Sequence, residues 1–218
     1  QDSSRHDHHT QQHLDNLENT IAQASSQHPL HQTLQQEIQT VFEQLPPLLL
    51  PRNLPQHVVH GDPKFSNLLF NTQQQAVALI DLDTCNRHSL LVDLGDAIRS
   101  WCRESGGEDE IKTFSIERYQ ALLQGYLSAA PQLTTEERAQ LHQAGPLITL
   151  ELTARFITDA FQDQYFGWDD SRYPSRPAHN TARAQAMSHL AKQMLQQQEA
   201  MADVAQEAYS THQKQIQV

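Results

Sequence analysis

Cysteine is scarce in this sequence of 218 residues, which contains only Cys85 and Cys102. Two cysteines cannot build the framework of several disulfides on which small secreted domains depend, so we expect a reducing, cytoplasmic environment. No apolar run approaches the ~20 residues that a membrane-spanning helix needs, and no signal peptide is recognisable. These absences predict a protein with no membrane partner.

Positive charge is also in short supply. Lys and Arg together number 15 against 26 Asp and Glu, which gives a formal net charge of −11. Nucleic acids and anionic membranes are bound by basic surfaces, so this balance argues against both as partners. An anionic nucleotide can still bind if Mg²⁺ and a few local cations neutralise its phosphates.

Aromatic residues make up 6% of the chain and hydrophobic residues 38%, both low values for a compact enzyme. Much of the polarity is glutamine near the two ends, which favours long solvated helices. Apolar spacing predicts helices over residues 10–27, 31–44, 91–103 and 119–127, after the Thr134–Glu137 capping-box motif, and from about Asn180 onward. Gly145 and Pro146 are expected to interrupt or kink the helix that follows the capping box.

Short apolar runs predict three strands, at residues 58–60, 68–70 and 76–80, with a turn at 71–74. The histidines at the start of the chain, His6, His8 and His9, lack acidic or cysteine neighbours at metal-ligand spacing. We therefore interpret them as a solvated lead-in to the first helix.

The predicted strands flank a motif in which His60, Asp62 and Asn67 follow the pattern H-x-D-x-x-x-x-N. In a phosphoryl-transfer site an Asp accepts or orients the proton of the attacking hydroxyl, and an Asn and a second Asp hold Mg²⁺ against the phosphates. Asp81 follows an apolar strand, where that second Asp belongs. We therefore predict Asp62 as catalytic base, with Asn67 and Asp81 as Mg²⁺ ligands because hard cations prefer oxygen donors.

Other charged side chains surround this motif. Lys64 is placed to stabilise the transferring phosphoryl group, and Asp83 to reach metal through water or to contact a substrate hydroxyl. His60 is expected to support the loop rather than to transfer a proton. Asp93 and Asp96 are expected to cap a helix and to brace the catalytic loop through backbone N–H groups.

Several features of a complete protein kinase are missing. Position 61 is Gly, so no arginine is present there to read a phosphorylated loop, and only a short connection follows Asp83. Both observations favour a small-molecule acceptor. The four lysines lie outside any strand that precedes the motif, no glycine-rich hairpin precedes it, and the chain begins at Gln1 rather than at Met. We therefore expect one lobe of a two-lobed enzyme, with the nucleotide-binding lobe outside this chain.

The HGDxxxxN and ID motifs resemble those of the aminoglycoside phosphotransferase and choline kinase superfamily. Ile80–Thr84, Asp93–Arg99, Glu151–Asp159 and Arg176–Asn180 look like the corresponding segments of N-acetylhexosamine 1-kinase and its relatives. The resemblance spans residues 58 to about 201. It implies that Asp62 deprotonates an anomeric hydroxyl, that ATP is the donor, and that the sugar is bound by Asp83, Arg155, Arg176, His179 and Asn180.

Together these inferences predict a mostly helical α+β fold for residues 1–218. It would be the larger, C-terminal lobe of a protein-kinase-like phosphotransferase, with a small β-hairpin catalytic centre. The expected activity is ATP- and Mg²⁺-dependent phosphorylation of a small molecule, with a sugar or amino sugar as partner. Two alternatives stay open: a kinase for an aminoglycoside or choline-like alcohol, and a non-catalytic binding module that lacks the nucleotide lobe.

Overall fold

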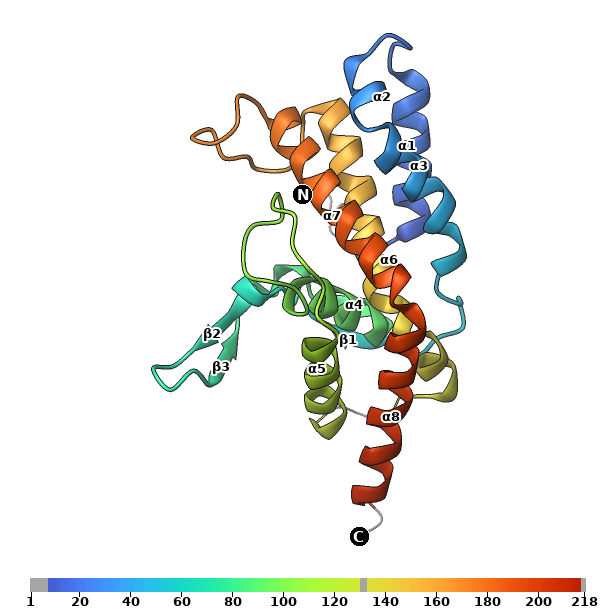
Figure 1. Ribbon diagram of the computed structural model, residues 1–218, viewed down its shortest axis with the longest axis vertical. Helices are drawn as coiled ribbons and strands as arrows, with labels where there is room; N and C mark the ends of the chain where they lie inside the picture. Colours follow the sequence, from blue (N-terminus) through green and yellow to red (C-terminus); the bar gives the residue numbers. More distant parts are fainter. Residues whose placement is uncertain (1–7, 130–132, 217–218) are drawn as a thin grey trace.

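The computed structural model describes residues 8–129 and 133–216, and within these ranges the protein is mostly helical with two small antiparallel sheets (Figure 1). The helices are α1 (Thr10–Gln23), α2 (Pro29–Thr33), α3 (Gln35–Gln44), α4 (Leu90–Trp101), α5 (Ile116–Ala129), α6 (Thr135–Gln162), α7 (Arg176–Gln196) and α8 (Gln198–Ile216). The strands are β1 (His57–Val59), β2 (Leu68–Phe70), β3 (Ala76–Leu79) and β4 (Asn86–His88). The predicted mostly helical α+β class is therefore confirmed.

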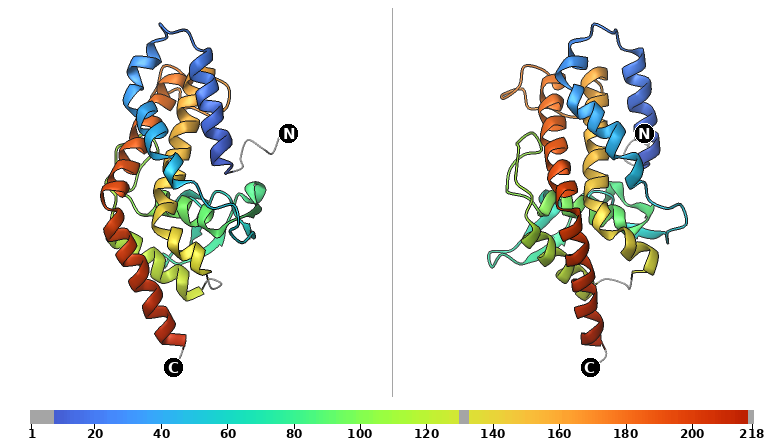
Figure 2. Two further views of the ribbon diagram at one scale, coloured as in Figure 1. Left: turned by 90° about the vertical axis from the view of Figure 1, so that its right-hand side faces the viewer. Right: turned by 45° about the vertical axis from the view of Figure 1, so that its right-hand side comes forward.

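Helix α6 is the central element, because α1, α4 and α7 all pack against it (Figures 1 and 2). It begins with the predicted capping box, in which the Thr134 hydroxyl and the Glu137 carboxylate each accept a backbone N–H bond from the other residue. Glycines allow α4 to approach closely. A Cβ at Gly95 of α4 would collide with the carbonyl oxygen of Ala144, and one at Gly145 would collide with Ile98.

The predicted interruption at Pro146 does not occur, since α6 continues through it to Gln162. Proline removes one helical hydrogen bond and usually weakens an interior position. Here the flanking turns are held from outside, because Leu147, Ile148 and Leu150 are almost completely buried. Tertiary packing thus outweighs the local preference of the sequence.

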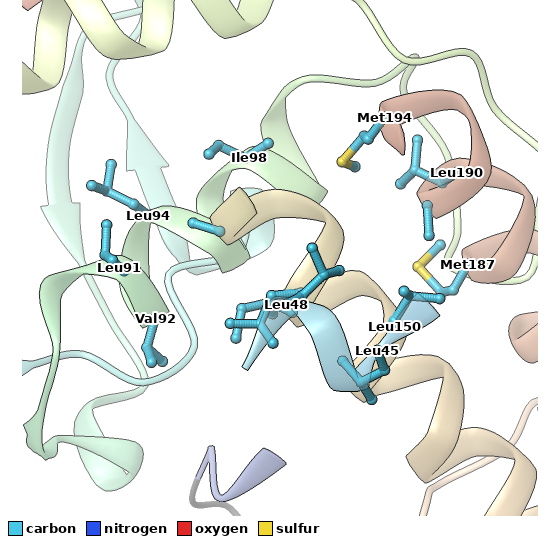
Figure 3. Close-up of a cluster of buried hydrophobic side chains, with 14 of the residues drawn as sticks. Leu45, Leu48, Leu91, Val92, Leu94, Ile98, Leu150, Met187, Leu190 and Met194 are labelled. Atoms are coloured by element: carbon cyan, nitrogen blue, oxygen red, sulfur yellow. The ribbon is translucent and has the colours of Figure 1, made fainter. Parts of the chain in front are cut away.

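One continuous hydrophobic core joins the helices. Figure 3 shows side chains from α4 (Leu91, Leu94, Ile98), α6 (Leu150) and α7 (Met187, Leu190, Met194) meeting in a single cluster with Leu45 and Leu48. This cluster fixes α4 against α6 and α7. Because α4 also carries polar residues of the candidate site, the core determines where those residues lie.

The two sheets are separate ribbons. Strand β1 pairs with β4, with Val58 opposite Arg87, and β2 pairs with β3, with Leu68 opposite Leu79. The β2–β3 hairpin projects from the helical body (Figure 1). Strand β4 is absent from the sequence prediction because its residues, Asn-Arg-His, carry no apolar signal and are extended through pairing with β1.

Several helix boundaries also differ from the prediction. The segment expected as one helix over 31–44 is divided at Leu34 into α2 and α3, and α7 begins at Arg176 rather than near Asn180. Ser175 caps α7 by accepting a hydrogen bond from the backbone N–H of Ala178. Among the described residues, none of the helices combines the length and apolarity that crossing a bilayer requires.

Candidate active site

The loop after β1 is held in place by hydrogen bonds from the side chains of Asp93 and His60. Asp93, in the first turn of α4, accepts hydrogen bonds from the backbone N–H groups of His60 (2.7 Å) and Gly61 (2.8 Å). The backbone N–H of Asp62 donates to His60 Nδ1, so His60 Nε2 carries the proton and donates to the Ile80 carbonyl at 2.9 Å. The expected bracing roles of Asp93 and His60 are confirmed.

Gly61 adopts a φ of +84°, in the region that side chains disfavour. A Cβ at this position would lie 2.5 Å from the carbonyl oxygen of Thr84. Glycine is therefore required for the turn that presents Asp62.

Asp62 is half-buried and paired with Lys64, whose Nζ lies 2.5 Å from Asp62 Oδ2. Burial raises the pKa of the Asp62 carboxyl, although the hydrogen bond from Lys64 opposes this shift. Burial lowers the pKa of Lys64, but the hydrogen bond and charge of Asp62, together with the charges of Glu108 and Asp96, outweigh that effect and the net shift is upward. The site thus holds a carboxylate of increased basicity beside a cation.

Asn67 connects this pair to the next strand. Its side-chain N–H₂ group donates to the Asp62 carbonyl (2.8 Å) and to Asp62 Oδ2 (3.3 Å). This orientation uses the amide nitrogen for Asp62 and leaves the amide oxygen as the atom that could bind a cation. The Asn67 carbonyl also accepts the N–H of Ile80, which brings Asp81 to the same loop.

Asp81 has a left-handed backbone conformation, with φ 69° and ψ 56°, which Asp tolerates better than most residues. It precedes the 3₁₀ turn Leu82–Thr84, which carries Asp83, and both carboxylates are exposed. In the described part of the chain no three His, Cys, Asp or Glu side chains gather into a metal site of their own. The oxygen donors of Asn67 and Asp81 nevertheless suit Mg²⁺, which usually takes one or two protein ligands and completes its shell with phosphates and water.

A cavity of about 400 Å³, here called the Asp62 cavity, opens beside this loop. Its walls include the predicted residues Asp62, Lys64, Asp81, Asp83 and Arg155. Arg155 reaches it from α6, with its guanidinium 5.5 Å from the ring centre of Phe166, another wall residue. Acidic side chains outnumber basic ones in the cavity wall. The basic groups are Lys64, Arg99, Arg155 and His8, and the six carboxylates are those of Asp62, Asp81, Asp83, Asp96, Glu108 and Glu151.

One ion-pair network in this wall escaped the sequence prediction. Arg99 is almost completely buried, with Asp96 at 2.7 Å and Glu108 at 2.9 Å from its guanidinium nitrogens. Burial alone would raise the pKa of Glu108, but Arg99 holds it below its ordinary value. The expected bracing role of Asp96 is therefore wrong, because its carboxylate pairs with Arg99 and not with the loop backbone. The spacing of Asp96 and Arg99, three apart on a helix, is the signal that could have revealed the pair.

The interpretation of the early histidines as solvated is wrong for His8. Its ring is buried, with Nδ1 2.7 Å from Glu151 Oε1 and Nε2 2.9 Å from the Gly61 carbonyl. His9 is exposed, as expected, and His6 lies outside the described residues. No local pattern marks His8, because both of its partners are distant in sequence.

Arg176, His179 and Asn180 lie at the start of α7 and do not line the Asp62 cavity. Arg176 donates to Asp163, His179 Nδ1 accepts the N–H of Asp169, and Asn180 donates to Asp159 Oδ2 at 2.8 Å. Arg176 and His179 contact the segment 163–175 directly, whereas Asn180 bonds to Asp159 of α6, whose carboxylate accepts backbone N–H groups of that segment. That segment supplies Tyr165, Phe166 and Gly167 to the cavity wall. The three residues of α7 therefore act on the cavity only indirectly.

A carboxylate, a cation and oxygen donors around one loop are the kinds of group that a phosphoryl-transfer site uses. Residues 1–142 match the model of the phosphotransferase enzyme family. The chain therefore belongs to that family.

Curated relatives include homoserine kinases. One from Sinorhizobium fredii is 34% identical over 113 residues, covering 52% of this chain and 31% of the relative. One from Caulobacter vibrioides is 30% identical over 116 residues, covering 53% of this chain and 33% of the relative. The chain thus spans about a third of the length of the curated relatives it matches.

Proposed function

We propose that these residues form the catalytic and acceptor-binding lobe of an ATP- and Mg²⁺-dependent kinase that phosphorylates a hydroxyl of a small molecule. The observation that carries the proposal is the Asp62–Lys64 pair, held by Asn67 at the edge of a cavity of about 400 Å³. In this proposal the nucleotide-binding lobe of the kinase-like fold lies outside the 218 residues.

The chemistry follows from the positions of the side chains. Asp62 accepts the proton of the acceptor hydroxyl while the hydroxyl oxygen forms its bond to the γ-phosphorus, and the bond between that phosphorus and ADP breaks. Lys64 donates to the developing negative charge. Asn67 and Asp81 would hold Mg²⁺, which neutralises phosphate charge when bound.

For the acceptor we propose a sugar or amino sugar, N-acetylhexosamine in particular, phosphorylated at its anomeric hydroxyl. The support is the resemblance of Ile80–Thr84 and Asp93–Arg99 to sugar 1-kinases, together with a wall that offers Asp83 and Arg155 to hydroxyl and amide groups.

A second candidate is a hydroxy amino acid, because the matched relatives are homoserine kinases. The mixed carboxylates and guanidinium groups of the cavity also suit a zwitterion. Excess carboxylates keep a third class open, the cationic aminoglycoside and choline-like alcohols.

The test is ATP consumption by the longest polypeptide that contains this chain, with Mg²⁺ and a panel of acceptors. N-acetylglucosamine, N-acetylgalactosamine, their methyl glycosides, homoserine, choline and an aminoglycoside would be compared. Turnover of the free sugars but not of the glycosides would support anomeric phosphorylation, whereas turnover of homoserine alone would replace the sugar by the amino acid.

An Asp62→Asn variant should lose at least ~10²-fold in kcat, the lower range for general-base catalysis. Asp203→Asn is the matched control, because Asp203 is exposed on α8 and lies outside the cavity wall. Absence of turnover with every acceptor, while the protein remains folded, would overturn the kinase proposal in favour of a binding module.

A further inference from the structure

His8 precedes His9, the N-cap of α1, and its side chain is buried against α6. The residue is 8% exposed, and its Nδ1 lies 2.7 Å from Oε1 of Glu151, a residue of α6 that is 1% exposed. Thr10 donates to the other carboxylate oxygen of Glu151 at 2.5 Å. The first residues of the described chain are thus attached to α6 by two bonds to one buried carboxylate.

The second ring nitrogen of His8 faces the catalytic loop. Nε2 lies 2.9 Å from the carbonyl oxygen of Gly61, the residue before Asp62. A carboxylate and a carbonyl are both acceptors, whereas a neutral imidazole has only one N–H group. With Glu151 ionised, only the doubly protonated ring can donate to both partners, so this geometry favours His8 as an imidazolium.

Gly61 is consequently held at both of its backbone polar groups. Its N–H donates to Asp93 at 2.8 Å, and its carbonyl accepts from His8. Gly61 has a positive φ and no side chain, so side-chain sterics do not restrain the orientation of its peptide groups. The hydrogen bonds therefore define that orientation. The Gly61–Asp62 peptide plane sets the direction in which the Asp62 carboxylate leaves the backbone.

We infer that the His8 imidazolium, fixed by Glu151, is a positioning residue that orients the Gly61–Asp62 peptide and thereby the Asp62 carboxylate. The inference rests on the proposed function for its catalytic consequence, but not for the protonation state or the loop contact. Glu151 acts on the loop through His8, and Thr10 keeps Glu151 in place.

The kinetic test compares His8→Gln and Glu151→Gln with the parent protein, in the longest polypeptide that contains this chain. Glutamine at position 8 carries no charge, and its single amide nitrogen cannot replace donors at two separate ring positions. We expect kcat to fall about tenfold in each variant, because small displacements of a reacting group reduce rate strongly. KM for the nucleotide should remain within about twofold, and the double variant should be no worse than the single ones because both remove the same contact.

Two further measurements separate positioning from simple loss of structure. His9→Gln changes the exposed neighbouring histidine and should retain the parent kcat. Added imidazole should partly restore kcat in His8→Ala, as expected if the ring alone is missing. Unchanged kcat in His8→Gln, or a loss of activity that only follows the folded fraction, would overturn the inference.

A spectroscopic measurement decides the matter even if no acceptor is turned over. In ¹⁵N NMR at pH 7, both ring nitrogens of His8 should show the shifts of a protonated imidazolium. The amide resonances of Gly61 and Asp62 should move in His8→Gln and stay in place in His9→Gln. A neutral His8 ring, or unmoved loop amides, would contradict the inference whatever the enzyme assay shows.

Discussion

At the scale of single residues, the Asp62–Lys64 pair makes a prediction about pH. Burial raises the pKa of Asp62, and the hydrogen bond and charge of Lys64 oppose this. In Lys64→Met the opposing contribution is lost, so the pKa of Asp62 should rise further. The acid limb of kcat/KM, which reports a base that must be deprotonated, should then move to higher pH. Lys112→Met, at a lysine that pairs with Glu110, is the control. An acid limb that does not move in Lys64→Met would argue against Asp62 as the base.

The buried His8–Glu151 pair makes a second prediction, for stability. Burial disfavours the charged ring, but the charge and hydrogen bond of Glu151, together with the charge of Asp96 and the bond to Gly61, outweigh it and raise the pKa of His8 from 6.5 to about 9. A raised pKa contributes stability that is complete below pH 6.5 and is lost as pH rises through about 9. The pKa of Glu151 is lowered from 4.5 against the effect of burial, so its contribution is lost as pH falls below that value.

Removing one partner of a buried pair leaves the other uncompensated. His8→Gln should therefore lower the free energy of unfolding by about 3 kcal/mol near pH 6. The difference from the parent protein should shrink as pH approaches 9, and urea unfolding at the two pH values measures it. A difference that is equal at both values would show that His8 is not charged in the folded protein.

At the scale of elements, the contact of α4 with α6 depends on Gly95. A Cβ there would collide with the Ala144 carbonyl and with Ile148, and a rigid helix backbone cannot move aside cheaply. Gly95→Ala should destabilise the protein by about 2 kcal/mol, within the usual range for overpacking. It should also disturb the loop, since α4 carries Asp93.

Gly125 in α5 is the matched control, because nothing lies within 4 Å of a Cβ placed there. Gly125→Ala should stabilise the protein by about 0.5 kcal/mol through helix propensity. Thermal unfolding of the two variants would test the pair. Equal effects of the same sign would mean that helix packing does not decide the outcome at Gly95.

The start of α6 gives a further prediction. The Thr134 hydroxyl accepts the backbone N–H of Glu137, and the Glu137 carboxylate accepts the N–H of Thr134. Thr134→Ala should cost about 1 kcal/mol in the free energy of unfolding, the usual value for a lost N-cap. Thr135→Ala, in the same turn but exposed, should cost less in the same denaturant titration. A larger loss at Thr135 would contradict the assigned cap.

At the scale of the whole molecule, the sequence predicted what depends on neighbouring residues. The strands at 68–70 and 76–79, the capping box and the loop around Asp62 all carry local signals, such as apolar runs or fixed spacing. Strand β4, the continuity of α6 through Pro146, and the burial of His8 could not be predicted, since each depends on partners far away in the chain. For the same reason the Arg176–Asn180 motif did not reveal that its polar side chains contact the segment 163–175 and Asp159 and do not themselves line the cavity.

The large sequence separation between His8 and Glu151 also has a consequence for folding. The two residues are 143 positions apart, and His8 and Gly61 are 53 apart. Contacts between distant residues form late, because closing a long loop is entropically unfavourable until other structure shortens it. During synthesis, Asp62 leaves the ribosome well before Glu151 does. We therefore expect the loop around Asp62 to reach its final geometry only after α6 has been synthesised, because Glu151 of α6 fixes the His8 ring that contacts the Gly61 carbonyl.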